Sequence, residues 1–148
     1  MEIAILPLGC FWGPEEKFSR LNGVINTEVG YCGGKTSSTS YEAVCTGSTN
    51  HAEVVKIEFD EKIISYENII EKFFEMHDPT TLNKQGPDTG TQYRSEIFYL
   101  NEKQKIIANK IKLKLNKQYN GKIVTNISKE KNYCIAEDYH QKFIQKRS

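Results

Sequence analysis

The chain has 148 residues, and its 20 Lys and Arg side chains are nearly balanced by 19 Asp and Glu side chains. This length fits one domain that buries a continuous core, and the near-zero net charge argues against nucleic-acid binding. No apolar run approaches the roughly 20 residues that span a bilayer, and no signal peptide is visible. We therefore expect no membrane association. The four cysteines form no C-x-x-C pair, which favours a cytoplasmic location.

Local patterns predict the elements of the first half. Pro14 suits the first turn of a helix, because its missing N–H would have no partner there, and Glu15 complements the positive end of that helix. Strict alternation at 52–59 predicts a strand with one apolar face. In chain order we expect a strand at 3–6, a helix from residue 14, a strand at 24–31, a short helix at 41–44 and a strand at 52–59.

The second half begins with the clearest helix. Apolar residues at helical spacing predict a helix at 66–76, with Ser65 as its N-cap. There follow a loop at 77–92, a strand at 95–100, a basic amphipathic helix at 102–119, a strand at 123–127 and a last helix starting near residues 136–138. Strands and helices mix without strict alternation. We therefore predict an α+β fold, a two-layer sandwich of a mixed sheet with packed helices, as one domain over residues 1–148.

Cys10 is the first candidate for chemistry, because it lies between the strand at 3–6 and the predicted helix. A thiolate at a helix N-terminus is stabilised by free backbone N–H groups and by the helix dipole. We therefore expect a lowered pKa for Cys10. Phe11 and Trp12 would place an apolar wall beside the sulfur, which suggests chemistry on a small, mostly apolar group. A cysteine of this kind is also often an inert core residue.

Polar groups that could assist the thiol gather in loops and at strand starts. They lie at Tyr41-Glu42, at 51–53, at 88–95 and at 137–141. The chain has no Walker A loop and no G-x-G-x-x-G motif, so it offers no nucleotide site. Its Cys and His residues lack zinc spacing, so we expect no metal.

These blocks resemble those of the peptide methionine sulfoxide reductase A family, which acts on the S epimer of the sulfoxide. The matching segments are 9–13 with Glu15-Glu16, 28–34, 41–45 with Gly47, 51–53, 77–80, Asn83, Gln85-Gly86, Asp88, 90–95 and 136–141. They follow the family order and cover nearly the whole chain. The family fold, a two-layer α+β sandwich, agrees with the fold predicted from the elements.

The resemblance implies an oxidoreductase, a peptide-methionine (S)-S-oxide reductase, that repairs oxidised proteins or reduces free methionine sulfoxide under oxidative stress. It implies a role for each matching residue. Cys10 is the nucleophile, and Phe11 and Trp12 hold the methyl group of the substrate. The groups that bind the sulfoxide oxygen are Glu53, Tyr41 and Tyr93, with Asp88 holding the surrounding network through a water or a backbone contact.

The chemistry explains these residue types. A sulfoxide sulfur is a poor electrophile until its oxygen gains a proton, so a carboxylic acid that stays protonated must face it. Burial raises a carboxyl pKa in that direction, and two tyrosine hydroxyls can donate to the same oxygen. Attack by Cys10 then leaves methionine and a sulfenic acid on the enzyme.

The chain departs from the family where the sulfenic acid must be reduced. Many members carry further cysteines in a C-terminal tail, whereas this sequence has none after Cys134. We therefore expect no bound cofactor and direct reduction by an external thiol, either thioredoxin, glutaredoxin or a small thiol. Cys134 or Cys32 could instead resolve the sulfenic acid, and Cys45 ranks last.

Two other functions compete. Cys10 could pair with His51 or His140 as base in a cysteine hydrolase or acyltransferase, which would form an acyl-enzyme instead of a sulfenic acid. Alternatively, Phe11 and Trp12 could form the aromatic pocket of a non-enzymatic binding module.

Overall fold

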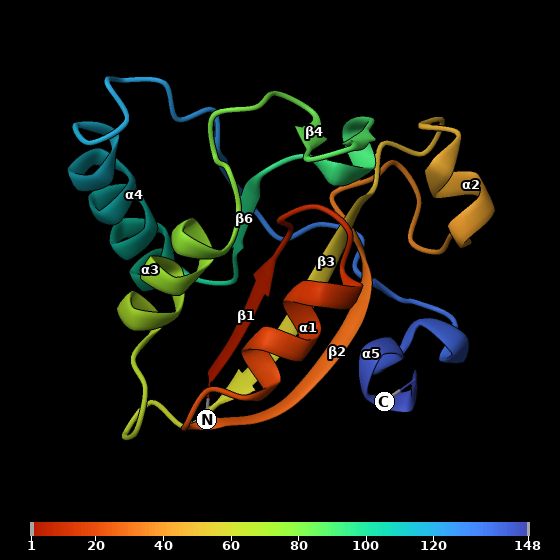
Figure 1. Cartoon of the computed structure of the whole chain (residues 1–148), viewed down its shortest axis with the longest axis horizontal. Coiled ribbons are helices and arrows are strands. Elements are labelled where there is room, and N and C mark those ends of the chain that lie inside the picture. Colours follow the sequence, from red (N-terminus) through yellow and green to blue (C-terminus); the bar gives the residue numbers. More distant parts are fainter. Residues whose placement is uncertain (1, 148) are drawn as a thin grey trace.

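The computed structural model describes residues 2–147, which are arranged around a six-stranded sheet (Figure 1). In spatial order its strands are β7 (Asn126–Lys129), β6 (Glu96–Tyr99), β1 (Glu2–Leu6), β3 (Ala52–Phe59), β2 (Val24–Cys32) and β8 (Cys134–Ile135). Neighbouring strands are antiparallel, except that β6 and β7 are parallel. The sheet is therefore mixed, as the sequence predicts.

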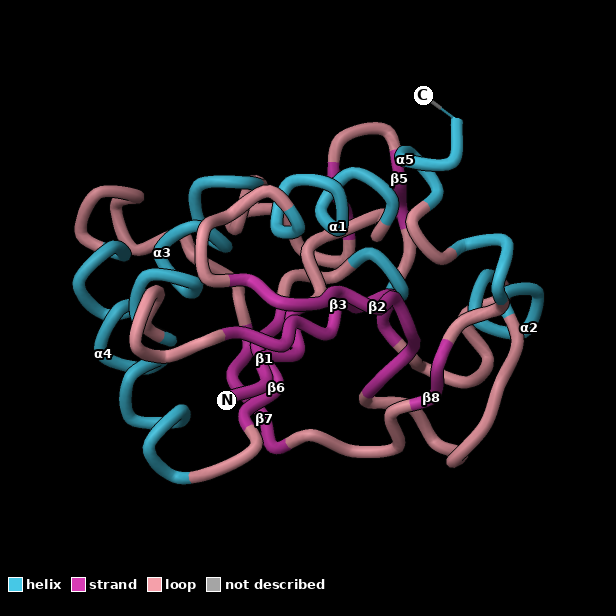
Figure 2. Tube along the Cα trace, turned by 90° about the horizontal axis from the view of Figure 1, so that it is seen from below, coloured by secondary structure: helices cyan, strands magenta, loops and turns pink. Residues whose placement is uncertain are grey.

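The three longer helices pack against this sheet. The helices are α1 (Trp12–Ser19), α2 (Tyr41–Cys45), α3 (Tyr66–Met76), α4 (Glu102–Asn116) and α5 (Phe143–Arg147). Figure 2 shows α1 and α3 on the same side of the strands, where α1 packs on β2 and α3 packs on β1 and on α4. The predicted α+β arrangement of a mixed sheet with packed helices is confirmed.

The alternation of β3 separates the two faces of the sheet. Val55, Ile57 and Phe59 are fully buried in the main core beneath the helices, whereas Val54 belongs to a smaller cluster with Cys32 on the opposite face. Successive strand residues point to opposite faces. Glu53 therefore projects from the same face as Val55 and Ile57, toward the helices.

Several predicted elements are confirmed almost to the residue. The strand at 52–59 and the helix at 66–76 have the predicted bounds, and Ser65 closes a capping box with Asn68. The chain between 77 and 92 also contains a short hairpin, β4 (Lys84–Gln85) with β5 (Asp88–Thr89). It is followed by a 3₁₀ turn, η1 (Thr91–Tyr93). No helix of the described residues is long and apolar enough to cross a membrane.

Two predictions near the C-terminus are wrong. The strand expected at 123–127 lies at Asn126–Lys129, because parallel pairing with β6 selects these residues rather than the apolar run. The last helix does not start near residues 136–138. A 3₁₀ turn, η2 (Asp138–His140), comes first, and α5 begins at Phe143. Between them Lys142 has a φ of 51°, which interrupts a right-handed helix.

Candidate active site

Cys10 lies in the turn that joins β1 to α1, and this turn packs against the β4–β5 hairpin. Gly9 has a φ of 95°, and a Cβ at this position would lie 2.7 Å from the Gln85 side chain. Only glycine meets both conditions. Gln85 pairs with Asp88 across the hairpin. The close packing at Gly9 therefore brings Asp88 into the neighbourhood of Cys10.

The pKa of Cys10 is shifted in the direction opposite to the one expected. Burial raises the pKa of Cys10 to about 11, the N–H of Trp12 lowers it, and the charges of Glu53 and Asp88 raise it further. The expectation of a lowered pKa is therefore wrong. Cys10 precedes the N-cap residue Phe11, and loss of hydration outweighs the single N–H that reaches the sulfur. The resting thiol is protonated.

Glu53 is the buried acid of the site. It is 1% exposed, and its Oε1 accepts a hydrogen bond from the backbone N–H of Phe11 at 3.3 Å. Its Oε2 is buried without a hydrogen-bond partner among the described residues. Burial raises the pKa of Glu53 to about 8, and the charge of Asp88 adds to this rise. The carboxyl group is therefore mostly protonated at pH 7, and it is bonded to Phe11, the residue that follows Cys10.

Two tyrosines come to the same place from different elements. Burial raises the pKa of Tyr93, in η1, to about 12, and the charges of Glu53, Asp88 and Cys10 contribute. Burial also raises the pKa of Tyr41, the first residue of α2, with a further contribution from Glu53. Both hydroxyls keep their protons at neutral pH and remain hydrogen-bond donors.

The two aromatic residues after Cys10 have different surroundings. Phe11 is 1% exposed and belongs to the core, with its ring centroid 5.8 Å from that of Tyr31. Trp12 is only partly buried. Its indole stacks on Phe143 of α5 at 3.8 Å with 9° between the rings, and its Nε1 donates to His140 Nδ1 at 3.1 Å. Of the pair, Trp12 is the ring with accessible surface.

All four cysteines are free. Cys32 belongs to the apolar cluster on the other face of the sheet, and burial raises its pKa to about 12. Cys134 pairs with Tyr31 across β8 and β2, as Glu53 does across β3 and β2. Cys134 therefore lies on the same face of the sheet as Glu53, two strands away. Cys45 is exposed, and its thiol bonds the hydroxyl of Tyr41.

No histidine acts on the thiol as a base. The groups that shift the pKa of Cys10 are Trp12, Glu53 and Asp88. His51 Nε2 lies 3.0 Å from the carbonyl oxygen of Thr36, and His140 bonds Trp12. A hydrolase with either histidine as base therefore lacks its base–thiol pair. Among residues 2–147, no group of three or more Cys, His, Asp or Glu side chains is arranged to hold a metal ion.

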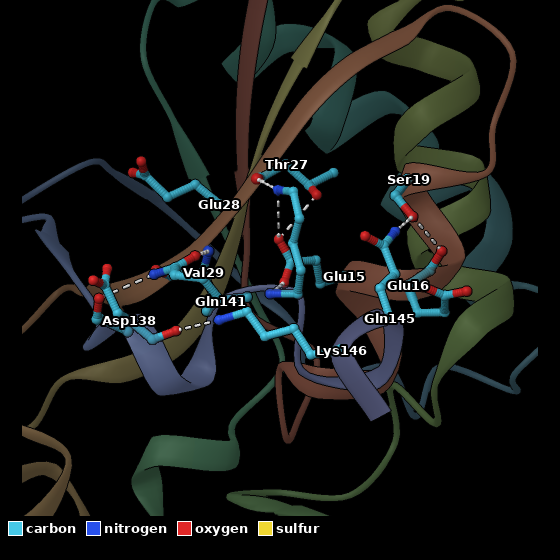
Figure 3. Close-up of polar contacts among 12 residues, drawn as sticks. Glu15, Glu16, Ser19, Thr27, Glu28, Val29, Asp138, Gln141, Gln145 and Lys146 are labelled. Carbon is cyan, nitrogen blue, oxygen red and sulfur yellow. Dashed lines mark hydrogen bonds and ion pairs between the residues drawn. The ribbon is translucent and has the colours of Figure 1, made fainter. Parts of the chain in front are cut away.

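The C-terminal segment supports the site in ways that local sequence patterns do not reveal. Glu137 accepts hydrogen bonds from the hydroxyl of Tyr31 at 2.8 Å and from the N–H of Tyr41 at 3.0 Å. The amide of Gln141 bonds both the N–H and the carbonyl of Val29, each at 2.9 Å (Figure 3). These partners are 96 to 112 residues apart in the chain. The only signal in the sequence is that Glu137 and Gln141 lie in a family block.

Glu15 belongs to the same support. It lies in the first turn of α1, as expected for a residue that complements the helix dipole. It is also 1% exposed and accepts hydrogen bonds from Thr27 Oγ1 at 2.9 Å and from the N–H of Lys142 at 2.6 Å. The ammonium of Lys142 lies 3.7 Å from Glu15 and donates to the carbonyl of Thr27. Figure 3 shows Glu15 reaching from α1 toward Thr27 of β2. The C-terminal segment is thus fastened to the helix that follows Cys10.

Comparisons with known proteins match nearly the whole chain to one family. A sequence model of the family described as peptide methionine sulfoxide reductase matches residues 2–148. A peptide methionine sulfoxide reductase MsrA of Pelagibacter ubique is 65% identical over 99% of this chain and 100% of its own. The crystal structure of Mxr1 from Saccharomyces cerevisiae in reduced form has a TM-score of 0.94 at 39% identity, covering 98% of this chain and 84% of that one. Mxr1 in complex with Trx2 has a TM-score of 0.69 at 26% identity, covering 96% and 84%.

Proposed function

The chain belongs to the peptide methionine sulfoxide reductase family, and from this premise we propose that Cys10 is its nucleophile and Glu53 its proton donor. The protein is an oxidoreductase that reduces methionine S-sulfoxide to methionine at the expense of thiols. Tyr41 and Tyr93 donate hydrogen bonds to the sulfoxide oxygen, and Asp88 holds the network around them. Trp12, with Phe11 behind it, forms the apolar wall for the methyl group.

The observation that carries this proposal is the state of Glu53. A carboxyl group with a pKa of about 8 and one oxygen free of protein partners is a proton donor held ready beside the thiol. Ionised carboxylates only accept hydrogen bonds, whereas a protonated one can donate. The site therefore offers a hydrogen-bond donor to the oxygen of the sulfoxide.

The protonated state of Cys10 sets the order of proton transfers. The sulfur of Cys10 attacks the sulfoxide sulfur while Glu53 gives its proton to the sulfoxide oxygen. The thiol proton then passes to the carboxylate of Glu53, so that S–H adds across the S=O bond overall. The intermediate releases methionine and transfers OH to Cys10 as a sulfenic acid. Two electrons move from the thiol to the sulfoxide, and Glu53 ends protonated as it began.

Reduction of the sulfenic acid is part of the proposal. Two external thiols supply the electrons: the first forms a mixed disulfide with Cys10 and releases water, and the second frees Cys10. The crystallised complex of Mxr1 with Trx2 supports a thioredoxin in this role, with a glutaredoxin or a small thiol as alternatives and no bound cofactor. Internal resolution by Cys134, or by Cys32, is the alternative. Cys134 ranks above Cys32 because it lies on the face of Glu53.

We propose that residues 1–148 act as one catalytic domain in the cytoplasm. The four free thiols support a reducing compartment. Its substrates would be oxidised proteins or free methionine sulfoxide, so that its role is repair after oxidative damage.

The decisive experiment uses purified, pre-reduced protein without a reductant and with each sulfoxide epimer in turn. Wild type is expected to form one methionine per protein molecule from the S epimer and none from the R epimer. Cys10→Ser is expected to form none, whereas Cys134→Ser keeps the single equivalent. Mass spectrometry after this turnover should show one added oxygen on Cys10. A Cys10→Ser protein that still forms methionine would refute the proposal, and an internal disulfide would replace direct reduction by internal resolution.

A further inference from the structure

His140 lies in the middle of the aromatic rings of the site, and the proposed mechanism gives this histidine no role. It is 1% exposed, and its ring centroid lies 5.1 Å from Phe11, 5.7 Å from Trp12 and 4.5 Å from Tyr41. These three rings come from the starts of α1 and α2, whereas His140 comes from η2. The histidine therefore contacts every aromatic ring of the site except Tyr93 from a fully buried position.

The hydrogen bond with Trp12 defines the protonation of His140. An indole N–H can only donate, so the Nδ1 of His140, 3.1 Å from Trp12 Nε1, must accept. The ring proton of the neutral imidazole is then on Nε2. Nε2 has no hydrogen-bond partner among the described residues. The bond from Trp12 is thus the polar contact that sets the orientation of the imidazole.

The same bond also determines the orientation of Trp12. Phe143 covers one face of the indole by parallel stacking at 3.8 Å. An apolar stack of this kind limits tilting of the ring but tolerates rotation within its plane. The directional bond from Nε1 to His140 removes that freedom. The two contacts together leave one orientation for the only tryptophan of the chain.

We propose that His140 is a positioning residue that fixes the indole of Trp12, and through it the apolar wall that holds the methyl group of the sulfoxide. The inference rests on the proposed function in assigning Trp12 to the substrate, but the Trp12–His140 bond itself does not depend on that assignment. A fixed wall lowers the entropic cost of ordering the side chain when substrate binds. His140 therefore acts on substrate binding, and not on the proton transfers.

The test compares His140→Asn with His140→Leu. Asparagine and leucine have nearly the same shape, but only asparagine can place an acceptor where Nδ1 lies. We expect the KM of the Leu variant to exceed that of the Asn variant by about fivefold, the value of one ordinary hydrogen bond. The single-turnover rates of the two variants at saturating substrate should agree within about twofold. Because Trp12 is the sole tryptophan, its fluorescence should be quenched more strongly by acrylamide in the Leu variant.

Two controls separate this role from general destabilisation. In a Trp12→Phe background there is no indole N–H, so the difference in KM between the Asn and Leu variants should vanish. The same pair at His77 changes a histidine whose ring bonds Phe73 and Ser95. These two His77 variants should have altered free energies of unfolding in urea, but their KM values should not differ from each other. Equal KM values for the Asn and Leu variants at position 140, or a difference that persists in Trp12→Phe, would overturn the proposal.

The native protein gives a second test that needs no variant to fold. Protonation of His140 would add a hydrogen to Nδ1 and break its bond to Trp12. The titratable groups around the ring are Glu137 and Tyr139 of its own turn and Tyr41 of α2. Burial lowers the pKa of His140 below 6.5, against a smaller rise from Glu137. Glu53 is mostly protonated below pH 7, so Trp12 emission should be constant from pH 7 to 6.5. Below pH 6.5 the emission should change, and KM should rise with it.

Emission that changes below pH 6.5 while KM stays constant would refute the role of His140. Failure of the proposed function would look different. If Cys10→Ser retained turnover, the mechanism would fall, whereas acrylamide quenching of the Asn and Leu variants would still report whether His140 holds Trp12.

Discussion

Glu53→Gln is the perturbation whose consequences can be worked out most fully. Glutamine keeps the shape of the side chain and can still accept the hydrogen bond from the N–H of Phe11. It removes the ionisable proton. We expect the single-turnover reduction of the sulfoxide to slow by about 10²- to 10⁴-fold, the usual contribution of a general acid, while the protein stays folded.

The same change should alter how stability depends on pH. The pKa of Glu53 rises from 4.5 to about 8 on folding. An acid with a raised pKa opposes folding above pH 4.5, where the unfolded chain ionises, and this opposition grows until about pH 8. At about 1.4 kcal/mol per pKa unit, the full cost is about 5 kcal/mol. Of this, about 3 kcal/mol develops between pH 5 and pH 7.5.

The assay is urea unfolding of wild type and Glu53→Gln at these two pH values. The free energy of unfolding of the variant, relative to wild type, should rise by about 3 kcal/mol from pH 5 to pH 7.5. Glu58→Gln, the same chemical change in the same strand, is the matched control. Its free energy of unfolding relative to wild type should change by less than about 0.5 kcal/mol between the two pH values. Equal pH dependence for wild type and Glu53→Gln would show that Glu53 is ionised in the folded protein. It would then have no proton to give.

Two further predictions concern the tyrosines and the support behind the site. Tyr93→Phe removes a hydroxyl that we propose donates to the sulfoxide oxygen, so the single-turnover rate should fall by about 10²-fold. The urea midpoint should stay within error of wild type, and an unchanged rate would leave Tyr93 without a catalytic role. Glu15→Gln removes the charge that faces Lys142 and weakens an acceptor of two hydrogen bonds. It should lower the free energy of unfolding by about 2 kcal/mol, and a neutral result would mean that solvent satisfies Lys142 equally well.

Local sequence predicts those parts of the fold in which each residue's environment follows from its neighbours in the chain. The alternation at 52–59 sets a strand, and Ser65 with Asn68 sets the start of α3. The prediction of a strand at 123–127 is wrong because a partner strand, β6, selects which residues pair. The short hairpin at 84–89 has too little apolar pattern to be seen, since it packs against the Gly9 turn rather than in the core.

The proposed site also contains residues that the sequence indicates and residues whose part only the fold reveals. The matching blocks point to Cys10, Glu53, Tyr41, Tyr93 and Asp88 without any coordinates, because these residue types suit a proton-assisted attack on a sulfoxide. Glu137, His140 and Glu15 also lie in matching blocks, but their residue types do not indicate what they do. Their partners lie about a hundred residues away, and nothing local records the contact.

The sequence by itself determined the family and the mixed α+β architecture, and it named the candidate residues of the proposed site. Only the tertiary structure decided their ionisation. The position of Cys10 before a helix indicated a lowered pKa, but burial beside Glu53 and Asp88 raises it. The reason is physical: the dipole of a helix follows from local order, whereas hydration is removed by residues from the whole chain. The charge state of a buried group is therefore a property of the fold.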